Sequence, residues 1–232
     1  MSEDQIKVEL LSYMGDDLSV VNAARVSFNK QSYWDVSNES YELPDKDAKL
    51  IHYLAKHKHY SPFGHCFASF RITAPIFVCR QLVKHEYLRM NEVSRRYVDT
   101  PPEFYTPDMW RGKAVDKKQG SSEDVITTMN TKSDPFMYPI DLFIDEHHHD
   151  CLSLYKGMLK AGVAPEQARS VLPLSIMTSW WWSGSMDAFA NMCKLRLKED
   201  TQYETRLVAQ QISDYMSNLY PISWGALLNE TD

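Results

Sequence analysis

Alternation of hydrophobic and polar residues predicts the first β-strands of this chain. Residues 6–13 alternate, and the apolar run at residues 172–182 is also typical of a strand. Residues 66–73 give the clearest pattern, because successive side chains of a strand point to opposite faces. One face of that strand holds Cys66, Ala68, Phe70 and Ile72, and the other holds Phe67, Ser69 and Arg71.

Helical spacing predicts two helices before the strand at residues 66–73. Residues 18–25 are helix formers, and Asp17 is expected to cap their N-terminus. Residues 45–58 place apolar side chains at helical intervals, and this helix should stop before Ser61-Pro62 because the residue before proline avoids helical geometry. After the strand, Pro75 is expected to be the first residue of a helix that runs to about residue 87. That helix would bring Gln81, Lys84 and His85 together at intervals of three and four.

The second half of the chain is predicted to be mainly helical. Residues 140–161 form a long helix that ends at Gly162, and residues 165–171 form a shorter one. Ser185 is expected to cap a helix that runs to residue 197, and residues 201–219 form a last helix before Pro221. Strands and helices do not alternate regularly. The order therefore predicts an α+β fold rather than a doubly wound sheet. Residues 108–135 are polar and predict an excursion of the chain on the surface.

Composition narrows the classes of function. The chain has 232 residues, a formal charge of -6 and 44% hydrophobic residues, which suffices for a packed core. The acidic balance argues against nucleic acid as the partner, and the absence of a long apolar run argues against a membrane span. The N-terminus lacks a signal-peptide core, and the four cysteines form no C-x-x-C pair. We therefore expect reduced thiols, a cytoplasmic protein and no metal site.

One stretch, residues 80–97, is locally basic within this acidic chain. It contains Arg80, Lys84, His85, Arg89, Arg95 and Arg96, with amide, hydroxyl and carboxylate side chains between them. Guanidinium groups bind phosphate oxygens, and the interleaved polar groups can bind the edge of a base. A small phosphate-bearing heterocycle fits this pattern. A solvated helix face with surface ion pairs fits the stretch about equally well when it is taken alone.

Two other runs invite functional readings that the residues do not require. Three consecutive histidines, residues 147–149, cannot share one helix face, so a polar helical turn is a better interpretation than a metal site. Three tryptophans, residues 180–182, suit core and interface packing better than a stacking platform, because alternate residues of a strand face opposite ways.

Four blocks of sequence together resemble a known enzyme family. They are HKHYSPFGH at 57–65, APIFVCRQLVKHEYLRMNEVSRRYVD at 74–99, ARSVLPLS at 168–175 and SMDAFANMCKLRL at 185–197. In this order they are similar to the flavin-dependent thymidylate synthases. The resemblance implies the fold of the thymidylate synthase complementing proteins, a mixed sheet with flanking helices in one domain over residues 1–232, with residues 108–135 as a surface insertion. It implies a homotetramer with active sites between subunits, and the cofactor FAD. It also implies conversion of dUMP to dTMP, with methylenetetrahydrofolate as carbon donor and NADPH as reductant.

The resemblance also assigns site residues. The positions implied to contact flavin are His59, Ser61, Lys84, His85, Glu86, Glu92, Ser185, Asp187 and Asn191. The positions implied to contact dUMP are Gln81, Lys84, Glu92, Ser94, Arg95, Arg96, Arg169 and Arg196.

Methylation of a uracil requires its C5 carbon to become nucleophilic. A cysteine adduct at C6 is one route, but no cysteine lies among the polar clusters, and Cys79 beside them is expected to face the core. Stabilising negative charge on the ring is the other route, and the resemblance gives this catalytic role to Arg196. Arg96 and Arg169 are interpreted as phosphate ligands, with Ser94 adding a hydroxyl. Ser94 lacks an adjacent base and is a poor candidate nucleophile.

The chain departs from the family at its central signature. Where the family has Arg-His-Arg, this chain has Lys84-His85-Glu86, so a carboxylate replaces one guanidinium. The departure leaves two alternatives to thymidylate synthesis open. One is a related enzyme that modifies a pyrimidine nucleotide differently, for example by hydroxymethylation, and the other is a catalytically impaired nucleotide-binding homologue.

Overall fold

A four-stranded antiparallel sheet forms the centre of the molecule. The computed structural model describes residues 5–37, 40–98, 100–115, 120–131 and 133–229. The strands follow the order β1 (Lys7–Met14), β4 (Phe67–Pro75), β10 (Met177–Ser185) and β5 (Leu88–Glu92), and every neighbouring pair is antiparallel. The α+β prediction is confirmed. The expectation of a mixed sheet is wrong, because these strands are joined by long excursions that return antiparallel.

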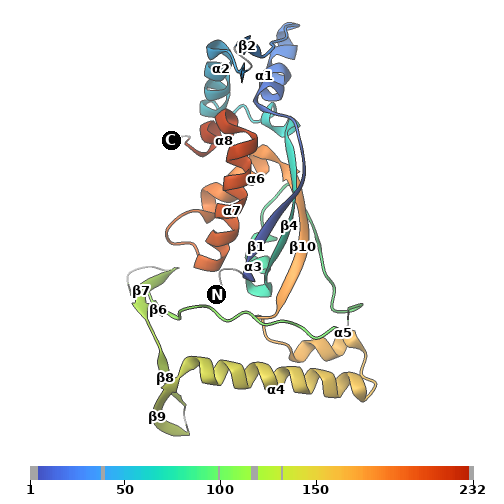
Figure 1. Cartoon of the computed structure of the whole chain (residues 1–232), viewed down its shortest axis with the longest axis vertical. Helices are drawn as coiled ribbons and strands as arrows, with labels where there is room; N and C mark the ends of the chain where they lie inside the picture. Colours follow the sequence, from blue (N-terminus) through green and yellow to red (C-terminus); the bar gives the residue numbers. More distant parts are fainter. Residues whose placement is uncertain (1–4, 38–39, 99, 116–119, 132, 230–232) are drawn as a thin grey trace.

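Helices cover one face of this sheet. Figure 1 shows α6 (Met186–Arg196), α7 (Tyr203–Leu219) and α8 (Pro221–Leu228) on the same side of β1, β4 and β10. Between them lies the aromatic core, where Phe70 and Trp182 each meet Phe189 edge-on, with ring centroids 5.2 and 5.5 Å apart. The opposite sheet face is bare in the single chain, and Trp181 there is 53% exposed. The alternation predicted for residues 66–73 is confirmed, since its apolar face is the buried one.

Two helices pack at one end of the sheet, beside a hairpin that the sequence did not predict. They are α1 (Asp17–Arg25) and α2 (Asp45–Lys56), and the hairpin joins β2 (Asp35–Ser37) to β3 (Ser40–Glu42). Asp16 caps α1 through a reciprocal capping box with Ser19, so the prediction of Asp17 as the cap is wrong. Asp17 instead accepts hydrogen bonds from the backbone of Ile222 and Ser223 at the start of α8.

The segment after β4 differs most from its prediction. Pro75 is the last residue of β4, and α3 (Ile76–Leu82) ends well before residue 87. Lys84, His85 and Glu86 therefore lie in a turn that ends at Tyr87, whose φ is +62°. Pairing of β5 with β10 overrides helical propensity here. Gly184 permits the close approach of β5, since a Cβ at that position would collide with the Leu88 side chain.

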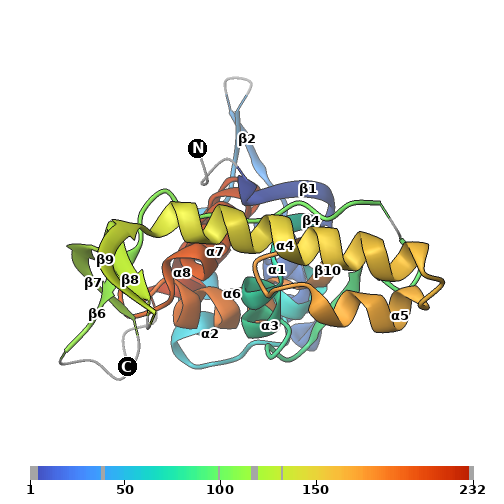
Figure 2. The same cartoon turned by 90° about the horizontal axis from the view of Figure 1, so that it is seen from below.

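Two small hairpins and a long helix extend below the sheet. The segment predicted as a surface insertion contains β6 (Arg111–Lys113), β7 (Ser121–Val125), β8 (Thr128–Thr131) and the start of β9 (Asp134–Pro139). Figure 2 shows α4 (Ile140–Lys160) beside α5 (Pro165–Ala168), which continues into a 3₁₀ turn at Arg169–Val171. Gly162 follows α4 with φ of +87°, as predicted. That residues 108–135 are an insertion in this family stays a prediction.

The histidine run on α4 is not uniformly polar. His148 is buried, stacks on Phe104 with centroids 4.4 Å apart, and its Nε2 lies 2.9 Å from the Ser175 hydroxyl. His148 therefore packs α4 against Phe104 and Ser175, a role that its interpretation as part of a polar helical turn did not include.

The C-terminal half contains two smaller corrections. The strand predicted at 172–182 begins only at Met177, after a turn at Pro173, and runs through Ser185. Ser185 is the N-cap of α6 as predicted, although its side chain makes no capping bond. Helix α8, after Pro221, was not predicted. All four cysteines are free thiols, and no helix in the described part of the chain is long and apolar enough to cross a bilayer.

Candidate active site

A cavity of about 800 Å³ gathers the largest group of expected substrate residues. We call it the arginine cavity. It lies where β5 ends and the 3₁₀ turn after α5 begins, so residues far apart in sequence meet there. Among its lining residues are Glu92, Ser94, Arg95, Arg96 and Arg169.

Local contacts hold these side chains in place. Arg96 Nε lies 3.4 Å from the Ser94 hydroxyl, and Arg169 Nε donates to the Glu166 carbonyl at 3.3 Å. Thr178 on β10 donates to a Glu92 carboxylate oxygen at 2.9 Å. Both guanidinium contacts use Nε, so within the described residues the terminal nitrogens of Arg96 and Arg169 remain for a ligand. Guanidinium forks beside a hydroxyl suit a phosphate.

Arg196 lies in a second cavity, of about 460 Å³, that we call the Arg196 cavity. Its Nε donates to His85 Nε2 at 2.9 Å, and its Nη2 lies 3.3 Å from the Gln81 carbonyl. These bonds join the end of α6 to α3 and to the turn that follows it. Gln81 and His85 therefore both contact Arg196, but the helix face predicted for Gln81, Lys84 and His85 does not form, because α3 ends at Leu82.

His85 must be neutral to accept from Arg196. A proton on Nε2 would remove the acceptor, so the proton of neutral His85 sits on Nδ1. Burial and the neighbouring Arg196 charge lower the His85 pKa to about 4. Burial also lowers the pKa of Arg196. At neutral pH, a charged Arg196 therefore donates a hydrogen bond to an uncharged His85.

A third cavity, of about 790 Å³, contains His59 and Ser61 and lies between α1 and α2. Arg25, Lys46 and Lys49 also line it, which favours an anionic ligand.

Three further expected flavin residues lie at the start of α6. Asp187 Oδ1 is buried without a hydrogen-bond partner among the described residues. Gly64 is its neighbour, since a Cβ added there would lie 3.9 Å from this oxygen. Ser185 precedes Asp187 at the helix cap, and the exposed Asn191 follows one turn later.

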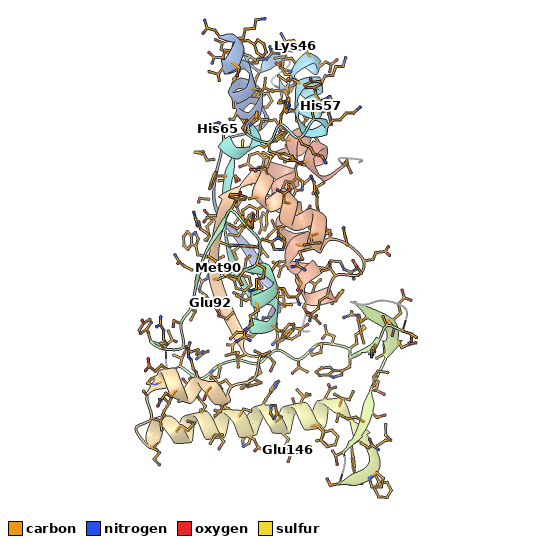
Figure 3. All side chains as sticks on the ribbon, turned by 180° about the vertical axis from the view of Figure 1, so that it is seen from behind. Lys46, His57, His65, Met90, Glu92 and Glu146 are labelled. Atoms are coloured by element: carbon orange, nitrogen blue, oxygen red, sulfur yellow. The ribbon has the colours of Figure 1, made fainter. Side chains whose placement is uncertain are left out.

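The single chain does not bring these groups into one site. In Figure 3, Glu92 lies toward the end of the sheet nearest α4, whereas His57 and His65, which flank His59 and Ser61, lie toward the other end. Lys84 and Glu86 are exposed in the turn between α3 and β5. The expected site residues therefore form separate groups.

Sequence reasoning missed the polar residues of α7 that hold Gln81. The Gln81 side chain hydrogen-bonds to Gln202, and Thr205 Oγ1 donates to Gln81 Oε1 at 3.2 Å. No pattern in the sequence indicated these residues, because the amphipathic spacing of residues 201–219 already accounted for them.

Comparison with known proteins shows to which family the chain is similar. A family model described as "Thymidylate synthase complementing protein" matches residues 9–222. The chain is 35% identical to the flavin-dependent thymidylate synthase of Kosmotoga olearia over 96% of this chain and 90% of that protein. It is 34% identical to the flavin-dependent thymidylate synthase of Thermus thermophilus, over 94% of this chain and 74% of that protein.

Solved structures give the same relationship. The UMP/dUMP methylase PolB from Streptomyces cacaoi, bound with 5-Br dUMP, aligns with a TM-score of 0.78 at 29% identity over 95% of this chain and 94% of that chain. The same protein bound with 5-Br UMP aligns with a TM-score of 0.73 at 26% identity. From the family match over residues 9–222 and these full-length similarities, the chain belongs to the thymidylate synthase complementing protein family, the family of the flavin-dependent thymidylate synthases.

Proposed function

We propose that this enzyme methylates C5 of dUMP to give dTMP, with FAD as cofactor, methylenetetrahydrofolate as carbon donor and NADPH as reductant. The observation that carries the proposal is the arginine cavity, which collects Glu92, Ser94 and four arginines from distant parts of the chain. This donor set suits a nucleoside monophosphate. Arg96 and Arg169 bind its phosphate, and Glu92 accepts from a sugar hydroxyl.

Arg196 supplies the electrostatic part of the reaction. Its guanidinium stabilises negative charge on the pyrimidine edge, so that ring electrons reach C5. His85 and Gln81 hold two of its nitrogens before any substrate binds, which limits the reorganisation needed in the transition state. No cysteine takes part in this route, and Cys79, as expected, is buried.

The proposed active site lies between subunits of a homotetramer. The arginine cavity and the Arg196 cavity have no lining residue in common, so a substrate that contacts both groups fits best between subunits. The bare sheet face offers a surface for this assembly, because its exposed aromatic side chains gain from burial. They include Phe67 and Trp181.

Residues suited to the flavin are present. The buried Asp187 oxygen without a partner among the described residues is an acceptor that a ribose hydroxyl or amine of a bound cofactor would satisfy. Ser185 and Asn191 flank this oxygen. The other residues proposed to hold FAD are His59, Ser61, Lys84, His85 and Glu86. Bound and reduced, the flavin supplies a hydride, and the protein positions the partners.

Methylation of UMP is a second candidate. The structural neighbour is described as a UMP/dUMP methylase, and structures bound with 5-Br dUMP and with 5-Br UMP both align with this chain. The two activities differ in whether the site accepts a ribose 2′-hydroxyl.

The test is product mass. The purified protein is given FAD, NADPH and methylenetetrahydrofolate without oxygen, with dUMP or UMP in parallel, and the nucleotide is weighed. We expect dTMP from dUMP. Ribothymidine monophosphate formed from UMP would favour the second candidate. A hydroxymethylated product would contradict both methylation activities and indicate a hydroxymethylating enzyme. Binding of dUMP without turnover in flavin-loaded protein would contradict the proposal and indicate an impaired homologue.

Assembly has its own test. Trp181→Lys places a charge on the exposed sheet face without touching the buried core, and the tetramer should dissociate and lose activity together. Analytical ultracentrifugation and a turnover assay on the same sample measure both. An active monomer would contradict a site shared between subunits.

A further inference from the structure

A cavity lined by aromatic side chains lies apart from the arginine cavity. It has a volume of about 570 Å³ and lies between the start of α7 and the segment that leads into β6. Contacts fix two of its rings. Trp110 Nε1 donates to Asp141 at 2.8 Å, and the buried Tyr105 meets Phe77 edge-on with centroids 5.9 Å apart. We call it the aromatic cavity.

Arginines line the neighbouring space. The guanidinium carbon of Arg111 lies 3.7 Å from the Tyr203 ring centroid, and that of Arg206 lies 5.6 Å from it. Both arginines line an adjoining cavity of about 630 Å³, which we call the Arg206 cavity. It shares Arg111, Ser121 and Tyr203 with the aromatic cavity. The aromatic cavity, with its flat apolar walls, therefore adjoins a cavity that offers guanidinium and hydroxyl donors.

Both cavities border the Arg196 cavity. Gly120 and Gln202 line the aromatic cavity and the Arg196 cavity, and Thr201 lines the Arg206 cavity and the Arg196 cavity. A molecule that fills the aromatic cavity would therefore end beside the catalytic arginine.

We propose that the aromatic and Arg206 cavities bind an adenosine phosphate, with the purine against Tyr105 and Trp110 and the phosphate on Arg111 and Arg206. Stacking on aromatic side chains is a general means of binding a base, and guanidinium groups bind phosphates bidentately. Glu204 on the wall of the aromatic cavity, only 9% exposed, is an acceptor for the exocyclic amine of the purine. The proposal rests on the proposed function, because FAD and NADPH both contain an adenosine phosphate.

The charges of the Arg206 cavity sharpen the inference. Glu123 and Glu199 line it together with the two arginines, so the charges of the lining side chains cancel. A phosphate there is held by local guanidinium bonds rather than by net charge. Removing one carboxylate should consequently strengthen binding, whereas a cavity that only attracts stray cations would show no such gain.

ADP titrated into the purified protein and followed by calorimetry tests the site. We expect Trp110→Leu and Arg111→Met each to weaken ADP binding about tenfold, through lost stacking and lost phosphate bonds. Glu123→Gln should strengthen it severalfold, a gain that misfolding does not mimic. Tyr33→Leu, which replaces an aromatic residue that is 69% exposed outside the cavity, is the control. No ADP binding, or equal affinity in all variants, would overturn the proposal.

Two further measurements identify the source of the adenosine phosphate. If the site serves the reductant, ADP binds to flavin-loaded protein and raises KM for NADPH. If it serves the flavin, ADP displaces FAD, seen as loss of protein-bound visible absorbance. Titration of dUMP is run beside both. Intact dUMP binding without ADP binding removes only this inference, whereas failure of dUMP binding contradicts the proposed function itself.

Discussion

Two groups of arginines in this molecule are held in opposite ways. Arg96 and Arg169 are exposed, and their contacts within the described residues leave the terminal nitrogens facing an open cavity. Arg196 is partly buried, and both its Nε and its Nη2 already have acceptors in the protein. Exposed guanidinium groups suffice to capture a phosphate, which carries a full charge in every state of the substrate. A group that stabilises charge only in the transition state must be positioned beforehand. The comparison predicts that the first group controls binding and the second controls rate.

Substitution of Arg196 should have the largest effect. Arg196→Lys keeps a positive charge but loses the planar fork and the bond to His85, so kcat should fall roughly 10²- to 10³-fold. Binding of dUMP, measured by calorimetry, should change much less. A loss confined to dUMP affinity would remove the distinction between the two groups.

Arg169→Met should have the converse effect. Loss of a charged donor to phosphate should raise the Kd for dUMP roughly 10- to 100-fold, while kcat at saturating dUMP stays near that of the unchanged protein. Lys160→Met, at the exposed end of α4, is the control for removal of a surface cation. An equal fall in kcat would place Arg169 in the chemical step.

His85→Gln tests whether Arg196 needs its acceptor. We expect kcat to fall about tenfold because a glutamine oxygen reaches Arg196 Nε less well than the imidazole nitrogen does. His85→Ala, which offers no acceptor, should lose more. Unchanged kcat in both variants would show that Arg196 is positioned without His85.

The same histidine predicts a dependence of stability on pH. Its pKa in the folded chain is about 4, below the ordinary value of 6.5. The unfolded chain therefore takes up this proton first, so acidification from pH 6.5 to about 4 destabilises the folded state. The melting temperature of the unchanged protein should fall more over this range than that of His85→Gln. Parallel curves would contradict the lowered pKa.

Glu86→Arg should have the smallest effect. It restores the last residue of the family signature at an exposed position, where solvent screens charge. We expect FAD affinity to increase a few-fold, measured by flavin fluorescence. Weaker FAD binding would mean that Glu86 itself takes part in the site.

The sequence predicted the parts of this fold that depend on local pattern. The alternation at residues 66–73 and the helices α4, α6 and α7 follow from local periodicity and from the residues that cap or end them. The end of α3 at Leu82 does not, because strand β5 forms only through its pairing with β10, a partner about ninety residues away in the chain. Tertiary pairing overrode local propensity there.

The same limit applies to the candidate site. The residue types of the stretch at 80–97 indicated a phosphate ligand, and the structure places Glu92, Ser94, Arg95 and Arg96 in one cavity. The bond from Arg196 to His85 joins residues 111 positions apart, and no local pattern predicts it. The aromatic cavity was also invisible in the sequence, since its rings come from separate segments that meet only in the fold.

The unequal burial of the thiols has a practical consequence. Burial raises the pKa of Cys66 and Cys79 to about 12 and raises that of Cys193 as well. Thiol-directed reagents require the thiolate and access to it, so these three should resist modification. Cys151, half-exposed on α4 beside His147, is the remaining cysteine. The natural chain thus provides a single attachment point for a fluorescent dye on α4, and no engineered cysteine is needed to follow that helix in solution.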